Sequence, residues 1–204
     1  MLNINGVTKS YGKKTALQKV TLTLSPGEIV GLFGENGAGK TTLMKCMLGY
    51  LRFRGKITLD GELISPKNIG RMSFATCEHS FFPNLNPAEH REFYRMNFTS
   101  FREKRFSGLM EFFQLPMNRA LRQFSVGQQN QFEVILALCQ GADYILMDEP
   151  FAGNDVFNRE DFYKVLMGIL EPEETLLLST HLIEEVQSFI GRAVLLHRGT
   201  VAGD

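Results

Sequence analysis

The sequence predicts an α/β fold with a mostly parallel sheet, an N-terminal antiparallel β subdomain and an inserted helical subdomain. Short apolar runs alternate with helical patterns towards both ends of the chain, which is typical of a parallel sheet covered by helices on both faces. Residues 77–140 differ, with three expected helices, many Phe residues and few β-branched runs. We therefore expect residues 1–76 and 141–204 to form one core and residues 77–140 a helical subdomain, within a single domain of residues 1–204.

Each expected element of the first half follows from its pattern of apolar residues. Residues 20–24 alternate apolar and polar side chains, which predicts a half-buried strand, and the apolar run of residues 28–33 predicts a buried central strand. Residues 40–50 place four apolar side chains on one helical face and contain a glycine near the end, so a helix is expected there. Residues 56–64 contain two short β runs about an Asp-Gly pair, which predicts a hairpin.

The second half begins with a helix-start signal and then returns to alternation. Asn86 can cap the first inserted helix, Pro87 suits its first position and Glu89 completes a capping box. Beyond residue 140 we expect a strand at 144–150, a helix at 159–170, a strand at 175–180, a helix at 181–190 and a strand at 193–199.

Composition favours a soluble protein of a reducing compartment. Lys+Arg 22 balance Asp+Glu 22, so we expect no nucleic-acid partner. The three cysteines are odd in number and widely spaced, which argues against a disulfide framework or a zinc site. No signal-peptide core is present, and no run approaches the ~20 apolar residues that span a bilayer, so we expect the chain itself to be soluble.

The strongest local motif is GENGAGKTT, residues 34–42, between an apolar strand and a helix. It satisfies G-x-x-x-x-G-K-[ST], in which glycines turn backbone N–H groups toward phosphate oxygens and the helix N-terminus adds partial positive charge. Lys40 is expected to reach the β- and γ-phosphates, and the Thr41 hydroxyl to bind Mg²⁺. The motif therefore predicts a P-loop NTPase core that takes ATP and Mg²⁺. The loop residues expected to bind ATP are Gly34, Asn36, Gly37, Gly39, Lys40, Thr41 and Thr42.

Polar groups also follow two of the later apolar strands. YILMDEP ends in Asp148, expected in the Mg²⁺ shell, and Glu149, expected to orient or deprotonate the attacking water. Without the phosphate loop an ordinary solvated acidic pair would be the better interpretation, and with the loop the catalytic one is favoured. His181 follows LLLST, and because the carboxyl ends of parallel strands share one edge, we expect it to donate a hydrogen bond to the γ-phosphate. A structural role for this histidine stays open.

FSVGQQ, residues 124–129, has two interpretations when taken alone. Ser at the start of an ordinary helix is common, because its side chain accepts a hydrogen bond from an N–H group of the first turn. A helix N-terminus also suits an anion, so a phosphate-binding turn is the alternative.

The motifs GENGAGKTT, FSVGQQ, ILMDEP, FAGND and STH, in this order, resemble those of the ATP-binding subunit of ABC transporters over essentially the whole chain. The resemblance implies that two subunits close head to tail, with each ATP between the phosphate loop of one and the FSVGQQ turn of the other, whose common form is LSGGQ. It implies that Ser125 and Gly127 contact the γ-phosphate of the partner's ATP, with Gln128 nearby. It further implies that Tyr11 stacks on adenine, with core packing as the alternative, and that Asp155 lies at the dimer interface.

The sequence departs from the family pattern at three places. Val126 replaces a glycine, and a β-branched residue is comfortable only at negative φ. Cys77 stands where the family usually has a Gln that links Mg²⁺ and the attacking water to the helical subdomain, and Glu78 could serve instead if the loop slips by one residue. Gln131 replaces an Arg usual after the turn. Hydrolysis is therefore expected to be slower, or nucleotide binding to be coupled differently to the partner.

The resemblance implies an ATPase that couples MgATP-driven dimer closure to transport by separate transmembrane subunits. It would act as a homodimer or with a homologous ATP-binding subunit, peripherally at the cytoplasmic face of the cell membrane, with no appended regulatory domain. Aromatic residues are expected either on the surface that receives the membrane subunits or in the core of the helical subdomain, namely Phe81, Phe82, Phe93, Tyr94 and Phe98. The alternatives are a soluble ABC-type ATPase acting on nucleic acid or ribosomes, and a regulatory module that binds ATP with weak turnover. No pattern names the cargo or the direction of transport.

Overall fold

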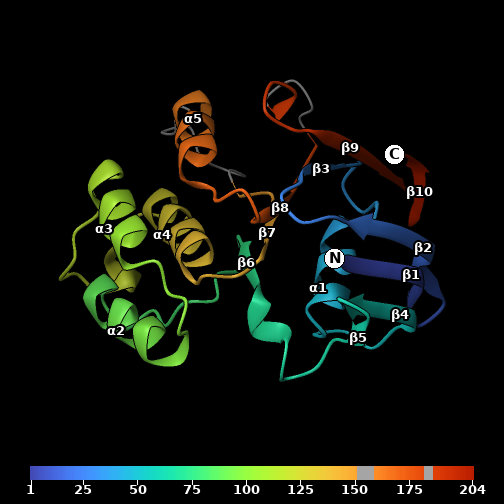
Figure 1. The fold of residues 1–204 in the computed structure, drawn as a ribbon, viewed down its shortest axis with the longest axis horizontal. Helices are drawn as coiled ribbons and strands as arrows, with labels where there is room; N and C mark the ends of the chain where they lie inside the picture. Colours follow the sequence, from blue (N-terminus) through green and yellow to red (C-terminus); the bar gives the residue numbers. More distant parts are fainter. Residues whose placement is uncertain (151–158, 182–185) are drawn as a thin grey trace.

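The fold combines two sheets with a group of helices, and the computed structural model describes residues 1–150, 159–181 and 186–204 (Figure 1). The smaller, antiparallel sheet contains β1 (Leu2–Tyr11), β2 (Lys14–Leu24), β4 (Arg54–Leu59) and β5 (Glu62–Leu63), in the order β2-β1-β4-β5. The larger sheet contains β3 (Ile29–Phe33), β6 (Met72–Thr76), β7 (Tyr144–Asp148), β8 (Thr175–Thr180), β9 (Arg192–His197) and β10 (Thr200–Gly203).

The larger sheet has the order β10-β9-β3-β8-β7-β6, and all its pairs are parallel except β9 with β10. The mostly parallel sheet predicted from the sequence is therefore confirmed, whereas β6 and β10 were not expected. The helices of the described residues are α1 (Lys40–Met47), α2 (Pro87–Asn97), α3 (Glu103–Phe112), α4 (Val126–Cys139) and α5 (Arg159–Ile169), with 3-10 turns at Ile69–Arg71 and Leu121–Gln123. None of the helices in these ranges is long and apolar enough to span a membrane. Of the helix expected at 181–190, residues 182–185 lie outside the described residues, and among the others only Val186 is helical.

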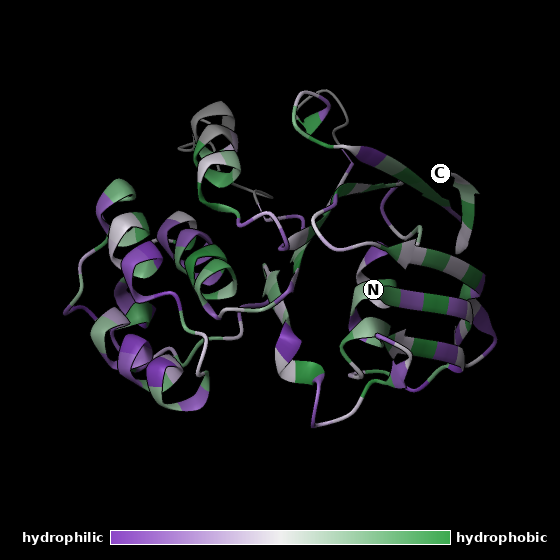
Figure 2. Cartoon of the chain, viewed as in Figure 1, coloured by the Kyte–Doolittle hydropathy of each residue, from purple (hydrophilic) through white to green (hydrophobic). Residues whose placement is uncertain are grey.

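The antiparallel sheet is held in register by buried leucines and by one tight turn. Leu2 of β1 lies opposite Leu24 of β2 and Leu59 of β4, and all three are buried. Figure 2 shows the resulting alternation of hydrophobic and hydrophilic residues along these strands. Asp60 and Gly61 both have positive φ, 51° and 87°, as a two-residue hairpin turn requires. The predicted hairpin is confirmed.

The ends of the helices follow the expected capping chemistry. Asn86 accepts a hydrogen bond from the backbone of Glu89, whose side chain in turn accepts one from the backbone of Asn86, so the predicted capping box is confirmed. Pro87 is the first residue of α2. After α1, Gly49 adopts φ 71°, the left-handed conformation that ends helices without steric cost to glycine.

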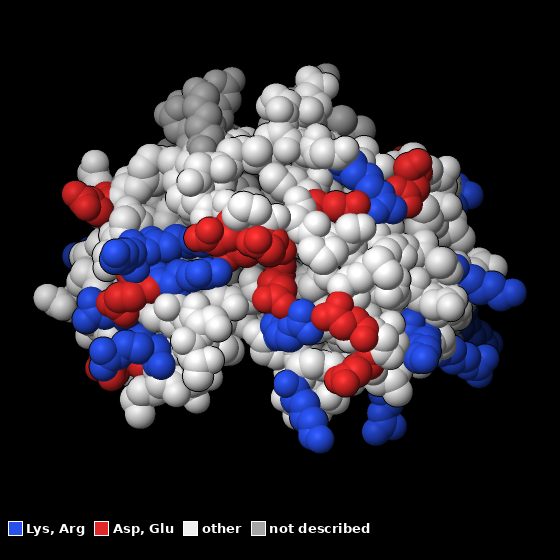
Figure 3. Space-filling view, in the orientation of Figure 1, with Lys and Arg blue, Asp and Glu red and all other residues white. Residues whose placement is uncertain are grey.

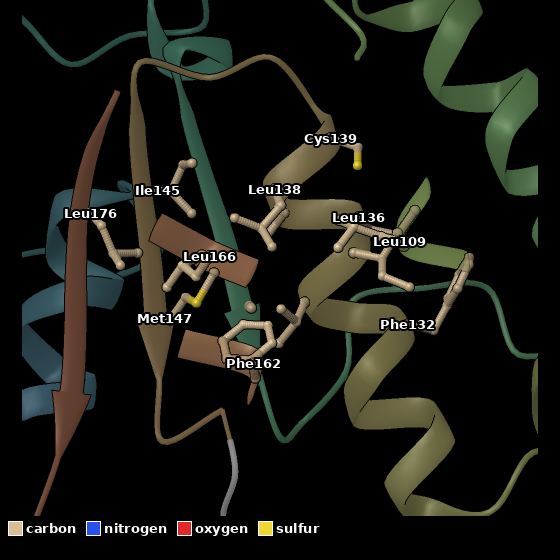
Figure 4. Packing of buried hydrophobic residues seen from close by; sticks show 14 of the residues in the cluster. Leu109, Phe132, Leu136, Leu138, Cys139, Ile145, Met147, Phe162, Leu166 and Leu176 are labelled. Atoms are coloured by element: carbon tan, nitrogen blue, oxygen red, sulfur yellow. The ribbon is translucent and has the colours of Figure 1, made fainter. Parts of the chain in front are cut away.

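The larger sheet separates two hydrophobic cores because successive side chains of a strand point to opposite faces. In β7, Ile145 and Met147 point toward α3, α4 and α5, whereas Tyr144 and Leu146 point toward α1 and the antiparallel sheet. Figure 4 shows the first of these cores, in which side chains of α4 and α5 face β7. Helices on both faces of the sheet, as predicted, follow from strands that are apolar on both sides.

A buried ion pair joins α3 to the segment that precedes β8. The guanidinium of Arg105 donates to both carboxylate oxygens of Glu174, at 3.0 and 2.9 Å, and to the backbone carbonyls of Leu138 and Ile169. The side chains of Arg105 and Glu174 are only 7% and 4% exposed. One side chain thus connects α3, α4, α5 and the loop before β8.

We predict that Glu174→Ala lowers the free energy of unfolding by about 3–5 kcal/mol, because it leaves the buried guanidinium with only the exposed carboxylate of Glu171, 3.8 Å away, as a counter-charge. Urea denaturation measures this. The control is Glu92→Ala, which removes an exposed pair with Arg95 in α2 and should cost no more than about 1 kcal/mol. Equal losses in the two variants would contradict the importance of the buried pair.

Candidate active site

The loop between β3 and α1 adopts a conformation that only glycines permit at two positions. Gly34 and Gly39 have φ 155° and 111°. A Cβ atom would lie 2.3 Å from the carbonyl oxygen of Leu196 at Gly34, and 2.8 Å from that of Ala16 at Gly39. Gly39 caps α1 without any side-chain hydrogen bond, so the N–H groups of the first turn face the loop. The loop is a cradle for an anion, as the motif predicts.

Lys40 lies across this cradle. Its side chain is 6% exposed, and Nζ donates to the carbonyl oxygen of Gly34 at 2.7 Å and that of Glu35 at 3.4 Å. Nζ also lies 3.2 Å from Oε1 of Glu149. The one ammonium group therefore links the phosphate loop to the end of β7.

The carboxylates after β7 differ in their surroundings. Asp148 is buried, and its Oδ1 accepts a hydrogen bond from the hydroxyl of Ser179 in β8. Glu149 has φ 47°, unusual for a residue other than glycine, and its backbone N–H donates to Ser179. Its Oε2 lies 2.8 Å from Nδ1 of His181, while Oε1 is buried and accepts no hydrogen bond from the described residues. The Glu149 carboxylate thus lies between a cation and an imidazole.

Most of these groups line one cavity of about 470 Å³, although Gly34 and the buried Asp148 are not among the residues around it. The residues around it are Tyr11, Lys14, Ala16, Asn36, Gly37, Gly39, Lys40, Thr41, Thr42, Cys77, Glu149 and His181. The structure therefore brings together most of the predicted ATP-binding and catalytic residues. Lys14 and Ala16 were not singled out from the sequence, although the strand that begins just after Tyr11 could have indicated them.

Tyr11 lies at the open side of this cavity. It is 50% exposed and belongs to neither hydrophobic core, which speaks against the packing alternative. The ammonium of Lys9 lies 4.9 Å from the centre of its ring. A half-exposed aromatic ring at the cavity edge suits stacking on a planar base.

The turn at residues 124–129 is the start of α4. Ser125 and Gln128 form a reciprocal capping box, with hydrogen bonds of 3.1 and 3.2 Å. Val126 is the first residue of the helix and is 66% exposed, so no positive φ is required there. Ser125, Gly127 and Gln128 are not among the residues around the 470 Å³ cavity. Within one chain this turn is a capped helix end that faces outward.

The structure distinguishes the two candidates in the loop after β6. Cys77 lines the cavity. Glu78 is not among the residues around the cavity, and its Oε2 lies 2.7 Å from Nζ of Lys45 in α1. Asp155, the expected interface residue, lies outside the described residues.

The site residues fit a magnesium ion held together with phosphates. The described residues contain no group of three or more His, Cys, Asp or Glu side chains that could hold a metal by themselves. Mg²⁺ is usually bound by one or two carboxylates together with substrate phosphates and water rather than by an all-protein cage. Asp148, the Thr41 hydroxyl and Oε1 of Glu149, which accepts no hydrogen bond from the described residues, are oxygen groups of the kind that such an ion and its waters contact.

Comparison with known proteins agrees with this geometry. Residues 17–152 match the family described as ABC transporter. The chain belongs to the ABC transporter ATP-binding family. The galactofuranose transporter ATP-binding protein YtfR of Escherichia coli K12 is 32% identical over the whole chain, which spans only 43% of that protein. The putative ABC transporter ATP-binding protein AlbC of Bacillus subtilis is 31% identical, with 97% of this chain and 88% of that protein covered.

Among solved structures, an ATP-binding cassette captured as a dimer in a post-hydrolysis state with ADP and Pi matches with a TM-score of 0.85. It is 24% identical and covers 100% of this chain and 97% of that one, so the ABC cassette fold is shown. ATP binding by this chain follows from its family.

We predict that Gly39→Ala lowers ATP affinity by at least about tenfold, because the added Cβ forces the cradle to shift and left-handed backbone costs about 1–3 kcal/mol for other residues. Fluorescence titration with ATP measures the affinity. The control is Gly61→Ala in the hairpin, where φ is 87° and a Cβ would meet no atom within 4 Å. It should lose stability but retain affinity, and a comparable loss of affinity in this variant would contradict a specific role of Gly39.

Proposed function

We propose that this chain is the ATP-hydrolysing subunit of an ABC transporter, in which MgATP closes a dimer of ATP-binding subunits and hydrolysis reopens it. The observation that carries the proposal is Glu149, whose carboxylate lies at the cavity between Lys40 and His181. A carboxylate beside the phosphate cradle can orient an attacking water and take its proton. We further propose that residues 1–76 and 141–204 act as the ATP-binding core and residues 77–140 as a helical subdomain.

Each predicted side chain has a physical role in this reaction. Lys40 would exchange its contacts with carbonyl oxygens and Glu149 for the β- and γ-phosphates. Thr41 and Asp148 would hold Mg²⁺, which supplies charge neutralisation to the phosphates when bound. His181 donates from Nδ1 to Glu149 and, when doubly protonated, can also donate from Nε2 to the γ-phosphate. Tyr11 would stack on the adenine.

The second half of the site comes from a partner subunit in this proposal. The outward-facing N-terminus of α4, with Ser125 and Gly127, presents N–H groups and a hydroxyl that suit a phosphate. Gln128 supports this turn through its hydrogen bond with Ser125. The dimer would pair two copies of the chain or this chain with a homologous subunit, and Asp155 would lie at their interface.

The membrane subunits have a candidate docking site between the larger sheet and α2. A cavity of about 570 Å³ there is lined by aromatic side chains, including Phe81, Phe82, Phe93, Tyr94 and Phe98. Tyr50, which precedes them in the sequence, lines it too. Tyr50, Phe82 and Phe93 are 66%, 47% and 39% exposed. Exposed aromatic surface around a groove is typical of a site for an amphipathic segment of a partner. We propose that a separate transmembrane subunit inserts such a segment, placing this chain at the cytoplasmic membrane face.

The alternatives receive less support. An ATPase acting on nucleic acid would need a broad cationic surface, whereas acidic and basic side chains lie close together over much of the face in Figure 3. A weakly hydrolysing regulatory module is favoured by one observation, namely that Cys77 lines the cavity in place of an amide. A thiol is a poor hydrogen-bonding substitute for an amide, so turnover is expected to be slow rather than absent.

We predict that Glu149→Gln lowers the rate of phosphate release by about 10²–10⁴-fold, because it removes the group that activates water. ATP affinity should be equal or higher, since Lys40 loses a competing anion. Phosphate release and ATP titration of the purified protein measure both, with Glu62→Gln in the exposed strand β5 as the charge-matched control. If wild type and variant are equally inactive with membrane subunits present, the enzymatic proposal is wrong.

We predict that Val126→Gly strengthens ATP-driven dimerisation several-fold, because the exposed branched side chain restricts how closely a partner's phosphate approaches the first turn of α4. The change costs α4 only about 0.5 kcal/mol of helix propensity. Light scattering with and without ATP measures the fraction of protein that is dimeric. Met96→Ala, which removes an exposed apolar side chain of α2, should leave dimerisation unchanged. An unaltered dimerisation constant for Val126→Gly would show that the valine does not restrain closure.

A further inference from the structure

The loop after β6 is attached on one side to α1, the helix that follows the phosphate loop. Glu78 extends from this loop, and its Oε2 lies 2.7 Å from Nζ of Lys45 in the last turn of α1. The preceding residue, Cys77, lines the nucleotide cavity. A displacement of α1, the helix whose first residues are Lys40 and Thr41, would therefore act directly on this loop.

The same loop is attached on its other side to α4. Both carboxylate oxygens of Glu133 lie 3.0 Å from the backbone nitrogen of Ser80, and Oε1 accepts a 2.7 Å hydrogen bond from the Ser80 hydroxyl. One turn earlier, Oδ1 of Asn130 lies 2.7 Å from Nε2 of His79. Asn130 and Glu133 are three residues apart, so they occupy one face of α4.

Glu133 is an unusual residue for its place. It is 1% exposed, within the otherwise apolar run of α4, and burial raises the pKa of its carboxyl group while the Ser80 hydrogen bonds lower it. A buried carboxylate is costly unless hydrogen bonds compensate for the lost water. Its partners are Ser80 of the loop and the backbone of Thr76 at the end of β6, and none is in its own helix. An apolar side chain could therefore fill the space but could not hold the loop.

We propose that Glu133 is a positioning residue: by holding Ser80 it fixes residues 78–80, here called the strut, to α4, and it thereby sets the N-terminus of α4 relative to α1. Ser125 lies eight residues from Glu133, about 12 Å along the helix at 1.5 Å per residue, so a small rotation about the attachment displaces the turn that meets the partner's nucleotide. The strut connects the chain's own phosphate loop to the turn that it offers to the partner. This role rests on the proposed function, because it concerns dimer closure.

The experiment compares Glu133→Ala and Glu133→Gln with the parent, all in a Glu149→Gln background that suppresses hydrolysis. Loss of the acceptor should increase amide hydrogen exchange in residues 76–82 of Glu133→Ala, measured without nucleotide. ATP affinity of the monomer should stay within about twofold, because the phosphate loop is untouched. ATP-driven dimerisation, measured by light scattering, should weaken about tenfold. Glu133→Gln keeps one acceptor oxygen and should recover part of both effects.

Two further variants separate positioning from general loss of stability. Leu109→Ala creates a cavity in the core of the helical subdomain without removing any hydrogen bond of the strut, and should leave ATP affinity and dimerisation unchanged. Ser80→Ala removes only the hydroxyl donor and should weaken dimerisation less than Glu133→Ala does. This milder variant still tests the strut if Glu133→Ala folds poorly.

The outcomes distinguish this proposal from the function on which it rests. Unchanged exchange in residues 76–82, unchanged dimerisation of Glu133→Ala, or an equal defect in Leu109→Ala would overturn the strut. A parent protein that binds ATP but never dimerises would instead overturn the proposed closure, while the exchange measurement would still show whether Glu133 holds the loop.

Discussion

The register of three neighbouring parallel strands determines where the chemistry lies. Phe33 of β3 pairs with Thr180 of β8, and Asp148 of β7 pairs with Ser179 of β8. The chain therefore leaves all three strands at one edge of the sheet. The phosphate loop, the acidic pair and His181 meet there although they are far apart in the sequence. The two cores on opposite faces fix this register, because a shift of one residue in strand pairing would turn each strand's side chains toward the wrong core.

The backbone is strained at two residues that follow the neighbouring strands β7 and β6. Glu149 has φ 47° and His79 has φ 55°, and neither is a glycine. Such conformations persist where surrounding contacts enforce them. The N–H of Glu149 donates to Ser179, and the N–H of His79 donates to the carbonyl of Thr76. Strain is thus located where a carboxylate must point into the cavity and where the strut turns toward α4.

The sequence was most informative where function depends on local pattern. The phosphate loop, most of the order of strands and helices, the capping box at Asn86 and the cap at Ser125 follow from spacing and from the chemistry of a few residue types. The sequence did not predict strand β10, because it is short and mostly exposed. The choice between Cys77 and Glu78 could not be made, because it depends on a contact with Lys45 more than thirty residues away. Glu133 and Ser80 were missed for the same reason, although a single acidic residue inside an apolar helix was a usable signal.

The distribution of cysteines has a consequence for labelling chemistry. Cys46 and Cys139 are buried in opposite cores, where burial raises the pKa of both thiols, that of Cys46 to about 11. Cys77 is exposed and lines the 470 Å³ cavity beside the phosphate loop. A thiolate reacts faster than a thiol, so an alkylating fluorophore at neutral pH would select Cys77. The chain therefore carries one attachment point for an optical reporter at the cavity that we propose for ATP, without any engineered substitution.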